Sequence, residues 1–111
     1  MNNIDAINAF LALGQETRLN TFRLIVQRGN LRLTPSEISE KLGIPQGTLS
    51  FHLKELLSAK LITVERQGRR LIYRPAADRI NELSNFLLEN CCGGQSCLRL
   101  SQERMSLTVR F

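Results

Sequence analysis

Two helical patterns separated by only three residues constrain the fold of this chain more than any other feature. The first pattern begins with the motif Thr34-Pro35-Ser36-Glu37, which supplies a capping residue, a proline at the first helical position and the acidic residue of a capping box. Residues 43–45, Gly-Ile-Pro, then separate it from a second helical pattern over residues 46–60. This spacing predicts a helix-turn-helix.

The second of these helices has two distinct faces. Leucines recur at i, i+4, i+7 and i+8 and predict its core face: Leu49, Leu53, Leu56 and Leu57. The opposite face is short or polar near the N-terminus, as in a helix that meets base edges and phosphates: Gly47, Thr48, Ser50, Phe51 and Lys54. Two interpretations of Phe51 stay open, contact with a thymine methyl group and packing on the preceding helix.

Two further residues of this helix belong to the predicted DNA-binding set. Gln46 stands at the start of the helix, where backbone phosphates approach a recognition helix. His52, the single histidine of the chain, lies at the border of the apolar face. A structural role and a place on the DNA side both fit His52, and a role as a metal ligand fits less well.

A basic hairpin is predicted directly after the second helix. Short β-prone runs at residues 61–65 and 71–73 flank a segment that holds Gly68 for the turn. The net charge of the chain is +5, and residues 61–75 alone contribute +3. We therefore expect a wing that grips backbone phosphate through three arginines: Arg66, Arg69 and Arg70.

Three more amphipathic patterns complete the predicted fold, at residues 4–13, 16–28 and 77–91. The chain is therefore expected to be mainly α with a β-hairpin wing, that is, a winged helix-turn-helix. We place one DNA-binding and sensing domain at residues 1–97. Residues 98–111 form a tail whose alternating pattern fits a short strand and a disordered terminus equally well.

All three cysteines of the chain lie within seven positions: Cys91, Cys92 and Cys97. Thiolates are the ligands that soft metals and metalloids prefer, and the intervening Gly93-Gly94 allows the chain to fold back. A lone cysteine would be read as core filler, but three in one short run indicate a soft-ion site. The odd count argues against a secreted disulfide framework and favours reduced thiols in the cytoplasm.

Three motifs together resemble the ArsR/SmtB family of metal- and metalloid-responsive repressors. They are Leu13-Gly14-x-Glu16-Thr17-Arg18-Leu19, Ser50-Phe51-His52-Leu53-Lys54-x-Leu56 and Gly68-Arg69-Arg70-x-x-Tyr73. The resemblance covers roughly residues 4–97. It implies a homodimer, paired through the first and last helices, that binds double-stranded operator DNA and represses a resistance operon until its ion binds.

Departures from the family pattern narrow the choice of ligand that we expect. One arsenite-sensing branch carries cysteines at the start of the first helix of the helix-turn-helix, where this chain has residues 36–40, Ser-Glu-Ile-Ser-Glu. Zinc-sensing members carry Asp and His ligands along the last helix, but residues 78–85 contain no histidine. The cysteine cluster resembles a branch whose thiolates lie just past the last helix. Trivalent arsenic or antimony accepts three thiolates, whereas zinc prefers four ligands.

Other classes of function compete with an arsenite-responsive repressor. A thiol redox switch would use the same cysteines to form a disulfide. An enzyme is not expected, because the chain has no Cys-x-x-Cys pair and no nucleotide loop. A purely architectural DNA binder would leave the cysteines without a purpose. We expect no required cofactor, with As(III) or Sb(III) as inducer, and no membrane segment, because the apolar runs are short.

Overall fold

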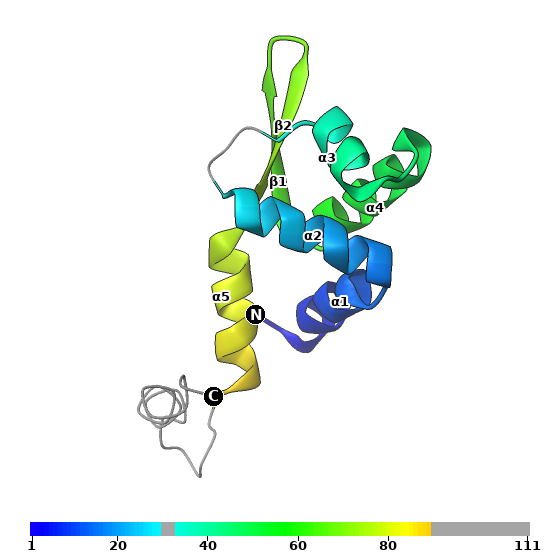
Figure 1. Cartoon of the computed structure of the whole chain (residues 1–111). Coiled ribbons are helices and arrows are strands. Elements are labelled where there is room, and N and C mark those ends of the chain that lie inside the picture. The colour runs from blue at the N-terminus through cyan, green and yellow to red at the C-terminus, as the bar shows by residue number, and fades with distance from the viewer. Residues whose placement is uncertain (30–32, 90–111) are drawn as a thin grey trace, which may run out of the picture.

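The computed structural model describes residues 1–29 and 33–89. This part of the chain folds into five helices and one antiparallel hairpin (Figure 1). The elements are α1 (Asn3–Leu13), α2 (Glu16–Arg28), α3 (Pro35–Leu42), α4 (Gln46–Ser58), β1 (Ile62–Gln67), β2 (Arg70–Pro75) and α5 (Ala77–Leu87). The predicted fold class, mainly α with a β-hairpin wing, is confirmed.

α3 begins and ends where the sequence predicts, but the second hydrogen bond of the predicted capping box goes to the Thr34 hydroxyl and not to its backbone N–H. The Glu37 backbone N–H donates to Thr34 Oγ1 at 3.4 Å, and Pro35 occupies the first turn. The Glu37 carboxylate accepts from the Thr34 hydroxyl at 3.1 Å, so it supports the cap through that hydroxyl. Gly43 ends the helix in the left-handed region at φ +66°, which a glycine adopts without a Cβ clash. The chain can therefore turn within three residues into α4.

The core lies where α2, α3 and α4 meet the base of the hairpin. Each of these helices, and the residue before β1, contributes a side chain that is at most 1% exposed: Ile25, Ile38, Leu49 and Leu61. The fully buried residues of α1 are all small, namely Ala6, Ala9 and Ala12, and its last residue, Leu13, packs against the core while partly buried. The alanines allow the backbone of α1 to approach α2 and α4 closely.

The hairpin is longer than the sequence predicts. β1 pairs with β2 from Ile62 opposite Pro75 to Gln67 opposite Arg70, so the turn is only Gly68-Arg69. Gly68 has φ +61°, as expected for a two-residue hairpin turn with glycine first. Arg66, Gln67 and Arg70 belong to the strands because the backbone pairing of an exposed hairpin continues regardless of side-chain polarity.

The base of the hairpin is tied to the body at two points. The Tyr73 N–H donates to the Leu33 carbonyl at 3.1 Å, and the Ala76 N–H donates to the Leu61 carbonyl at 2.9 Å. The wing therefore projects from a fixed base, and Figure 1 shows its tip far from α1 and α5.

The last helix ends earlier than the pattern over 77–91 predicts. α5 ends at Leu87, and the Leu88 N–H closes it by donating to the carbonyls of Ser84 and Asn85. Residues 90–91 of the expected helix, and the tail at 98–111, lie outside the described residues. α5 contacts α1, and an ion pair between Arg79 and Asp5 at 3.6 Å joins the two helices. Within residues 1–29 and 33–89, no helix has the length and apolar character needed to span a membrane.

Candidate nucleic-acid interface

Helix α4 separates its residues into the two faces that its sequence predicts. Leu49, Leu53 and Leu56 are buried at 0–2% exposure, and Leu57 packs against the core. The other face is exposed along its first turns and carries the predicted DNA-facing residues: Gln46, Gly47, Thr48, Ser50, Phe51 and Lys54. No side chain caps the first turn and no acidic residue lies in it, so the positive end of the helix dipole is available to an anion.

Phe51 is held at the surface by an arginine from α2. The ring is 53% exposed, so it is not buried against α3. The guanidinium carbon of Arg18 lies 5.6 Å from the ring centroid, a cation–π distance. The ring also meets His52 edge-on, with centroids 5.6 Å apart and planes at 64°. An exposed aromatic side chain supported in this way remains available to an apolar group such as a thymine methyl.

His52 is buried, with 6% exposure, although the sequence placed it in the DNA-binding set. Its Nδ1 accepts a long hydrogen bond from Arg18 Nε at 3.4 Å. Burial, and to a lesser extent the positive charge of Arg18, lowers the pKa of His52 below its usual value of 6.5. The burial favours the structural role that the sequence left open over direct contact with DNA.

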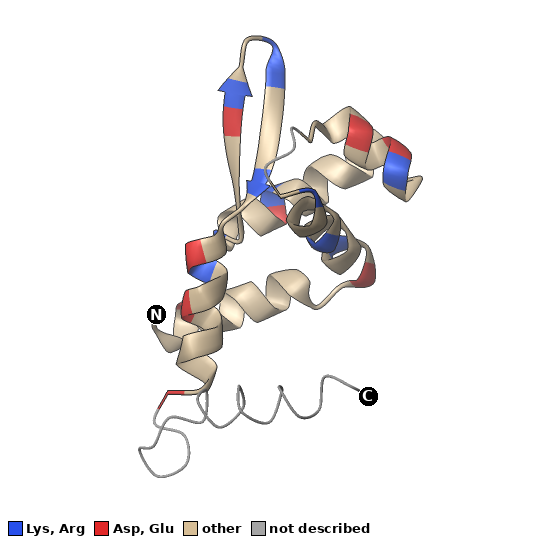
Figure 2. Ribbon diagram, turned by 60° about the vertical axis from the view of Figure 1, so that its left-hand side comes forward, with Lys and Arg blue, Asp and Glu red and all other residues tan. Residues whose placement is uncertain are grey.

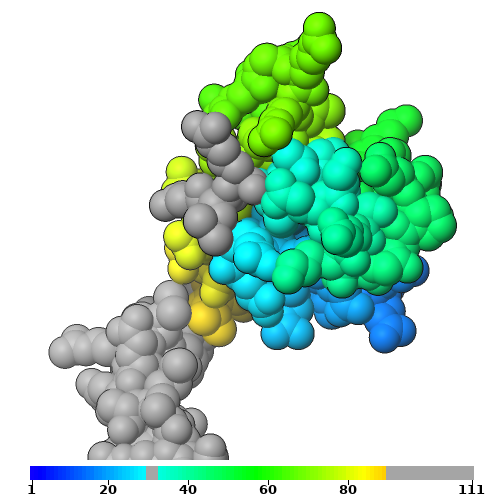
Figure 3. Space-filling view, turned by 45° about the horizontal axis from the view of Figure 1, so that its top comes forward, coloured from blue at the N-terminus to red at the C-terminus, as the bar shows by residue number. Residues whose placement is uncertain are grey.

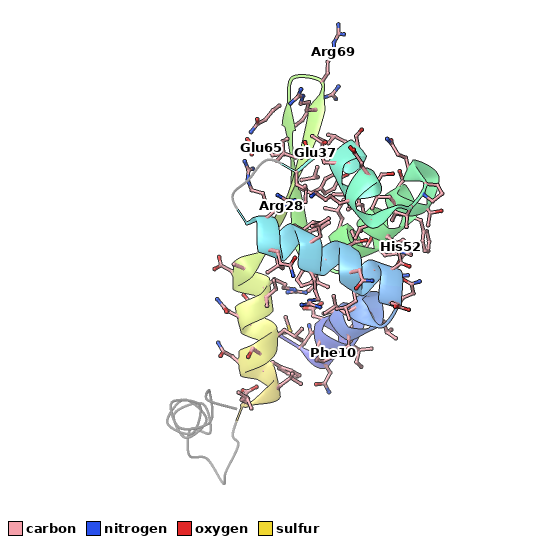
Figure 4. The ribbon with its side chains drawn as sticks, in the orientation of Figure 1. Phe10, Arg28, Glu37, His52, Glu65 and Arg69 are labelled. Carbon is pink, nitrogen blue, oxygen red and sulfur yellow. The ribbon has the colours of Figure 1, made fainter. Side chains whose placement is uncertain are left out.

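The arginines of the wing differ in their exposure and in their partners. Arg69 and Arg70 are exposed, and Figure 4 shows Arg69 pointing away from the tip. Arg66 is also exposed, and its Nε donates to the Gly68 carbonyl across the turn at 3.3 Å. Arg74, nearer the base, pairs with Glu65. Positive charge therefore gathers toward the tip of the hairpin, as the blue segments in Figure 2 show.

A hollow of ≈ 410 Å³ brings the wing and the helix-turn-helix together. Gln46 from the start of α4 lines it together with Arg69 and Arg70 from the wing. Figure 3 shows the wing extending beyond the surface of α3 and α4. The structure thus brings Gln46 together with Arg69 and Arg70, which lie more than twenty positions later in the sequence.

Sequence reasoning missed Ser36, which contacts Gln46, and Arg18, which contacts Phe51 and His52. Ser36 lines the hollow, and its hydroxyl accepts from Gln46 Nε2 at 3.3 Å. Ser36 lies in the first turn of α3, a position that often faces phosphate and could have drawn notice. Arg18 gave no such signal, because its contacts with Phe51 and His52 join residues more than thirty positions apart.

The predicted metalloid ligands Cys91, Cys92 and Cys97 lie outside the described residues. Within residues 1–29 and 33–89, no three His, Cys, Asp or Glu side chains gather closely enough to hold a metal ion. The described part of the chain therefore presents a candidate interface for nucleic acid, and its chemistry is that of positive charge and exposed short side chains.

Comparison with known proteins decides the family. Residues 13–65 match a model of a helix-turn-helix domain. The chain is 35% identical over 83 residues to the arsenical resistance operon repressor of Bacillus subtilis, and the match covers 75% of each protein. The chain belongs to the ArsR family of transcriptional regulators. The chain spans 92% and 96% of the length of two further curated regulators of the helix-turn-helix type. It spans only 22% of the length of a third, longer one.

Solved structures show the same fold for this ArsR-family chain. An ArsR-like transcriptional regulator from Rhodococcus matches with a TM-score of 0.69 at 19% identity, over 96% of this chain and 91% of that one. A homodimeric winged helix-turn-helix domain from Mycobacterium bovis matches with a TM-score of 0.63 at 23% identity, over 79% and 82% of the two chains. The role of a transcriptional regulator, which is not that of an enzyme, rests on the relatives in sequence.

Proposed function

We propose that this ArsR-family regulator is a repressor that leaves its operator DNA when trivalent arsenic or antimony binds Cys91, Cys92 and Cys97. The observation that carries the proposal is the 35% identity to a repressor named for arsenical resistance. The chemistry of the donor set supports it, since three thiols within seven positions suit a three-coordinate soft ion. The ion would supply the inducing signal, and no further cofactor is proposed.

Double-stranded DNA is the proposed partner of the exposed face of α4 and of the wing. Short polar side chains at Thr48 and Ser50, with Phe51 and Lys54 beside them, would meet base edges in the major groove. Arg66, Arg69 and Arg70 would contact phosphate, which fixes position without reading sequence. Gln46, and Ser36 to which it is hydrogen-bonded, would lie beside the wing where the helix-turn-helix contacts the DNA backbone.

A second copy of the chain is proposed to cover the outer face of α1. The large apolar residues of this helix are exposed at i, i+3 and i+7, with Ile4 at 70%, Ile7 at 55% and Leu11 at 67%. Leu87 on the neighbouring α5 is 59% exposed. Full burial of such a side chain from full exposure contributes about 1.5–3 kcal/mol, so covering these partly exposed side chains contributes less than that each but still favours self-association of this face. Two recognition helices would then be held about one DNA turn, roughly 34 Å, apart.

Release of DNA requires that the ion bind the DNA-free conformation more tightly than the DNA-bound one. The difference between these two binding free energies equals the free energy by which the ion weakens DNA binding. The cysteines follow α5 in sequence, and α5 contacts α1, so a change at the thiols would reach the helices of the proposed dimer. An altered dimer would change the spacing of the two recognition helices.

The test is a titration of the reduced protein on a duplex that it selects from a random pool. Arsenite should release wild-type protein, while Cys92→Ser and Cys97→Ser should keep DNA binding and lose most of the response. Cys91→Ser should lose the response as well. Ser96→Ala, between the cysteines, is the matched control and should respond like wild type.

Two further measurements decide between the metalloid site and its alternative. X-ray absorption of bound arsenic should find three sulfur neighbours, and two sulfurs with one oxygen would contradict the three-thiolate site. Equal arsenite affinity of free and DNA-bound protein would exclude the release mechanism. Release by peroxide, with no release by arsenite, would establish the redox switch in place of the metalloid sensor.

A further inference from the structure

Two segments that are far apart in sequence meet at Arg18. This arginine lies near the start of α2, and its guanidinium reaches two adjacent residues of α4, Phe51 and His52. A third contact runs to α1, where Arg18 Nη1 donates to the Ala12 carbonyl at 3.3 Å. One side chain thus joins three helices beside the exposed face of α4.

The three contacts constrain the guanidinium in different directions. The planar group donates through Nε to His52 Nδ1 and through Nη1 to the Ala12 carbonyl, so two of its donors are fixed. The Nε bond requires an Nδ1 that carries no proton, which is the case in one neutral tautomer of histidine. With its plane held by these bonds, the guanidinium covers one side of the Phe51 ring.

Phe51 needs such support if it is to read a base. A phenylalanine that is 53% exposed has few neighbours to select one rotamer, and ordering it on binding has an entropic cost. A fixed cation above one side, with the edge of His52 beside it, orients the ring before DNA arrives. Preorganisation of this kind raises discrimination without adding any contact to the DNA.

We propose that Arg18 is a positioning residue for base recognition, which orients Phe51 through the joint contact with His52 and the Ala12 carbonyl. The inference rests on the proposed function, because it requires that Phe51 faces DNA. It assigns to Arg18 an effect on which sequence is preferred, and not a contact with phosphate. Arg18 also fastens the recognition helix to the end of α1, the helix proposed to form the dimer.

The experiment measures base discrimination and uses a matched control. Wild type, Arg18→Gln, Phe51→Ala and the double variant are titrated with the selected duplex and with single-base-pair variants of it. The position read by Phe51 is the one at which Phe51→Ala loses discrimination. Arg23→Gln is the control, because Arg23 is an exposed arginine on the same helix and its side chain makes no hydrogen bond or ion pair with any residue of 1–29 and 33–89.

Arg18→Gln should reduce discrimination at the position read by Phe51 by about three- to tenfold, the range expected for one lost cation–π contact and one freed side chain. In the Phe51→Ala background it should cause no further loss of discrimination, because the residue it positions is absent. Arg23→Gln should leave discrimination unchanged. Independent, multiplying effects of Arg18→Gln and Phe51→Ala would overturn the proposal, as would equal discrimination by Arg18→Gln and Arg23→Gln.

A measurement on the unaltered protein tests the contact even if Arg18→Gln fails to fold. His52 is the single histidine, so its nitrogen NMR signals are unambiguous. An unprotonated Nδ1 at neutral pH is expected, and a protonated Nδ1 would overturn the proposal. If wild type prefers no duplex at all, the proposed function and this inference both fall. If wild type is selective and only Arg18→Gln behaves like the control, this inference falls alone.

Discussion

At the scale of single residues, His52 shows how packing sets a protonation state. The side chain is buried, and Arg18 is the charged group that the structure places against it. Burial and then the charge of Arg18 lower the pKa of His52. Both causes act against the imidazolium form, which would also lose the bond that Nδ1 accepts. The folded state therefore favours neutral His52.

The lowered pKa of His52 predicts a loss of stability in mild acid. In the unfolded chain the histidine takes up a proton as the pH falls through about 6.5, but the folded chain does so only at lower pH. The free energy of unfolding should be independent of this group above that value and should fall as the pH drops toward the folded pKa. Thermal unfolding from about pH 8 to about pH 5 measures the effect.

His52→Gln is the comparison for this pH dependence, because glutamine keeps a polar side chain and does not titrate. Wild type should lose more stability than His52→Gln over the same interval. Parallel curves for the two proteins would show that His52 is not held neutral in the folded state.

At the scale of elements, the turn between α3 and α4 depends on one backbone conformation. Gly43 has φ +66° and open space where a Cβ would lie, so the strain of a larger residue would come from the backbone alone. Gly47, in the first turn of α4, also has open space but no positive φ. The two glycines therefore separate conformational strain from steric fit.

We predict opposite effects for alanine at these two glycines. Gly43→Ala should lower the free energy of unfolding by about 1 kcal/mol, because alanine is strained in the left-handed region. Gly47→Ala should leave it unchanged or raise it by up to about 1 kcal/mol, because alanine favours the helix. Denaturant unfolding without DNA measures both. An equal loss in the two variants would contradict the role given to the conformation of Gly43.

The wing leads to a prediction about salt. Arg69→Ala combined with Arg70→Ala should weaken binding to all duplexes alike and make the dependence of log K on log salt concentration shallower, by about 0.9 for each lost phosphate contact. Arg23→Ala combined with Arg28→Ala removes the same charge from α2 and should leave the slope close to that of wild type. A slope unchanged by the wing variants would exclude phosphate contact by these arginines.

At the scale of the whole molecule, α1 is turned so that its small residues face inward. The three alanines pack in the core, and the large side chains Ile4, Ile7 and Leu11 face solvent in the single chain. Figure 1 places α1 and the end of α5 opposite the tip of the wing. Association through this end would leave both wings and both α4 helices accessible to one DNA molecule.

The exposed face of α1 predicts the effect of a buried charge on assembly. Ile7→Glu should convert a dimer into a monomer, because an unpaired carboxylate would be desolvated at the interface. Affinity for the operator should fall with it, since one subunit makes half of the contacts. Sedimentation measures the mass. Val26→Glu, at an apolar residue of α2 that is 44% exposed, should leave the dimer intact, and an intact Ile7→Glu dimer would contradict the assembly.

The sequence by itself determined the order of the elements and much of the candidate site. Periodicity, capping residues and turn glycines act over a few positions, so the helix-turn-helix, the core face of α4 and the turn at Gly68 could all be read directly. The exposed arginines of the wing followed from their place beside that turn. The cysteine cluster is likewise a sequence observation, and its ligand rests on thiol chemistry alone.

Only the tertiary structure decided which faces meet. Helical spacing groups residues on one side of α1 but does not say whether its alanines or its larger residues face the core. The tertiary structure also places Arg18 against His52, and Gln46 beside Arg69 and Arg70. These contacts join residues far apart in the chain, and their energies depend on packing that no local pattern encodes. Packing also decided that His52 is buried, whereas the sequence alone placed it at the border of the apolar face of α4.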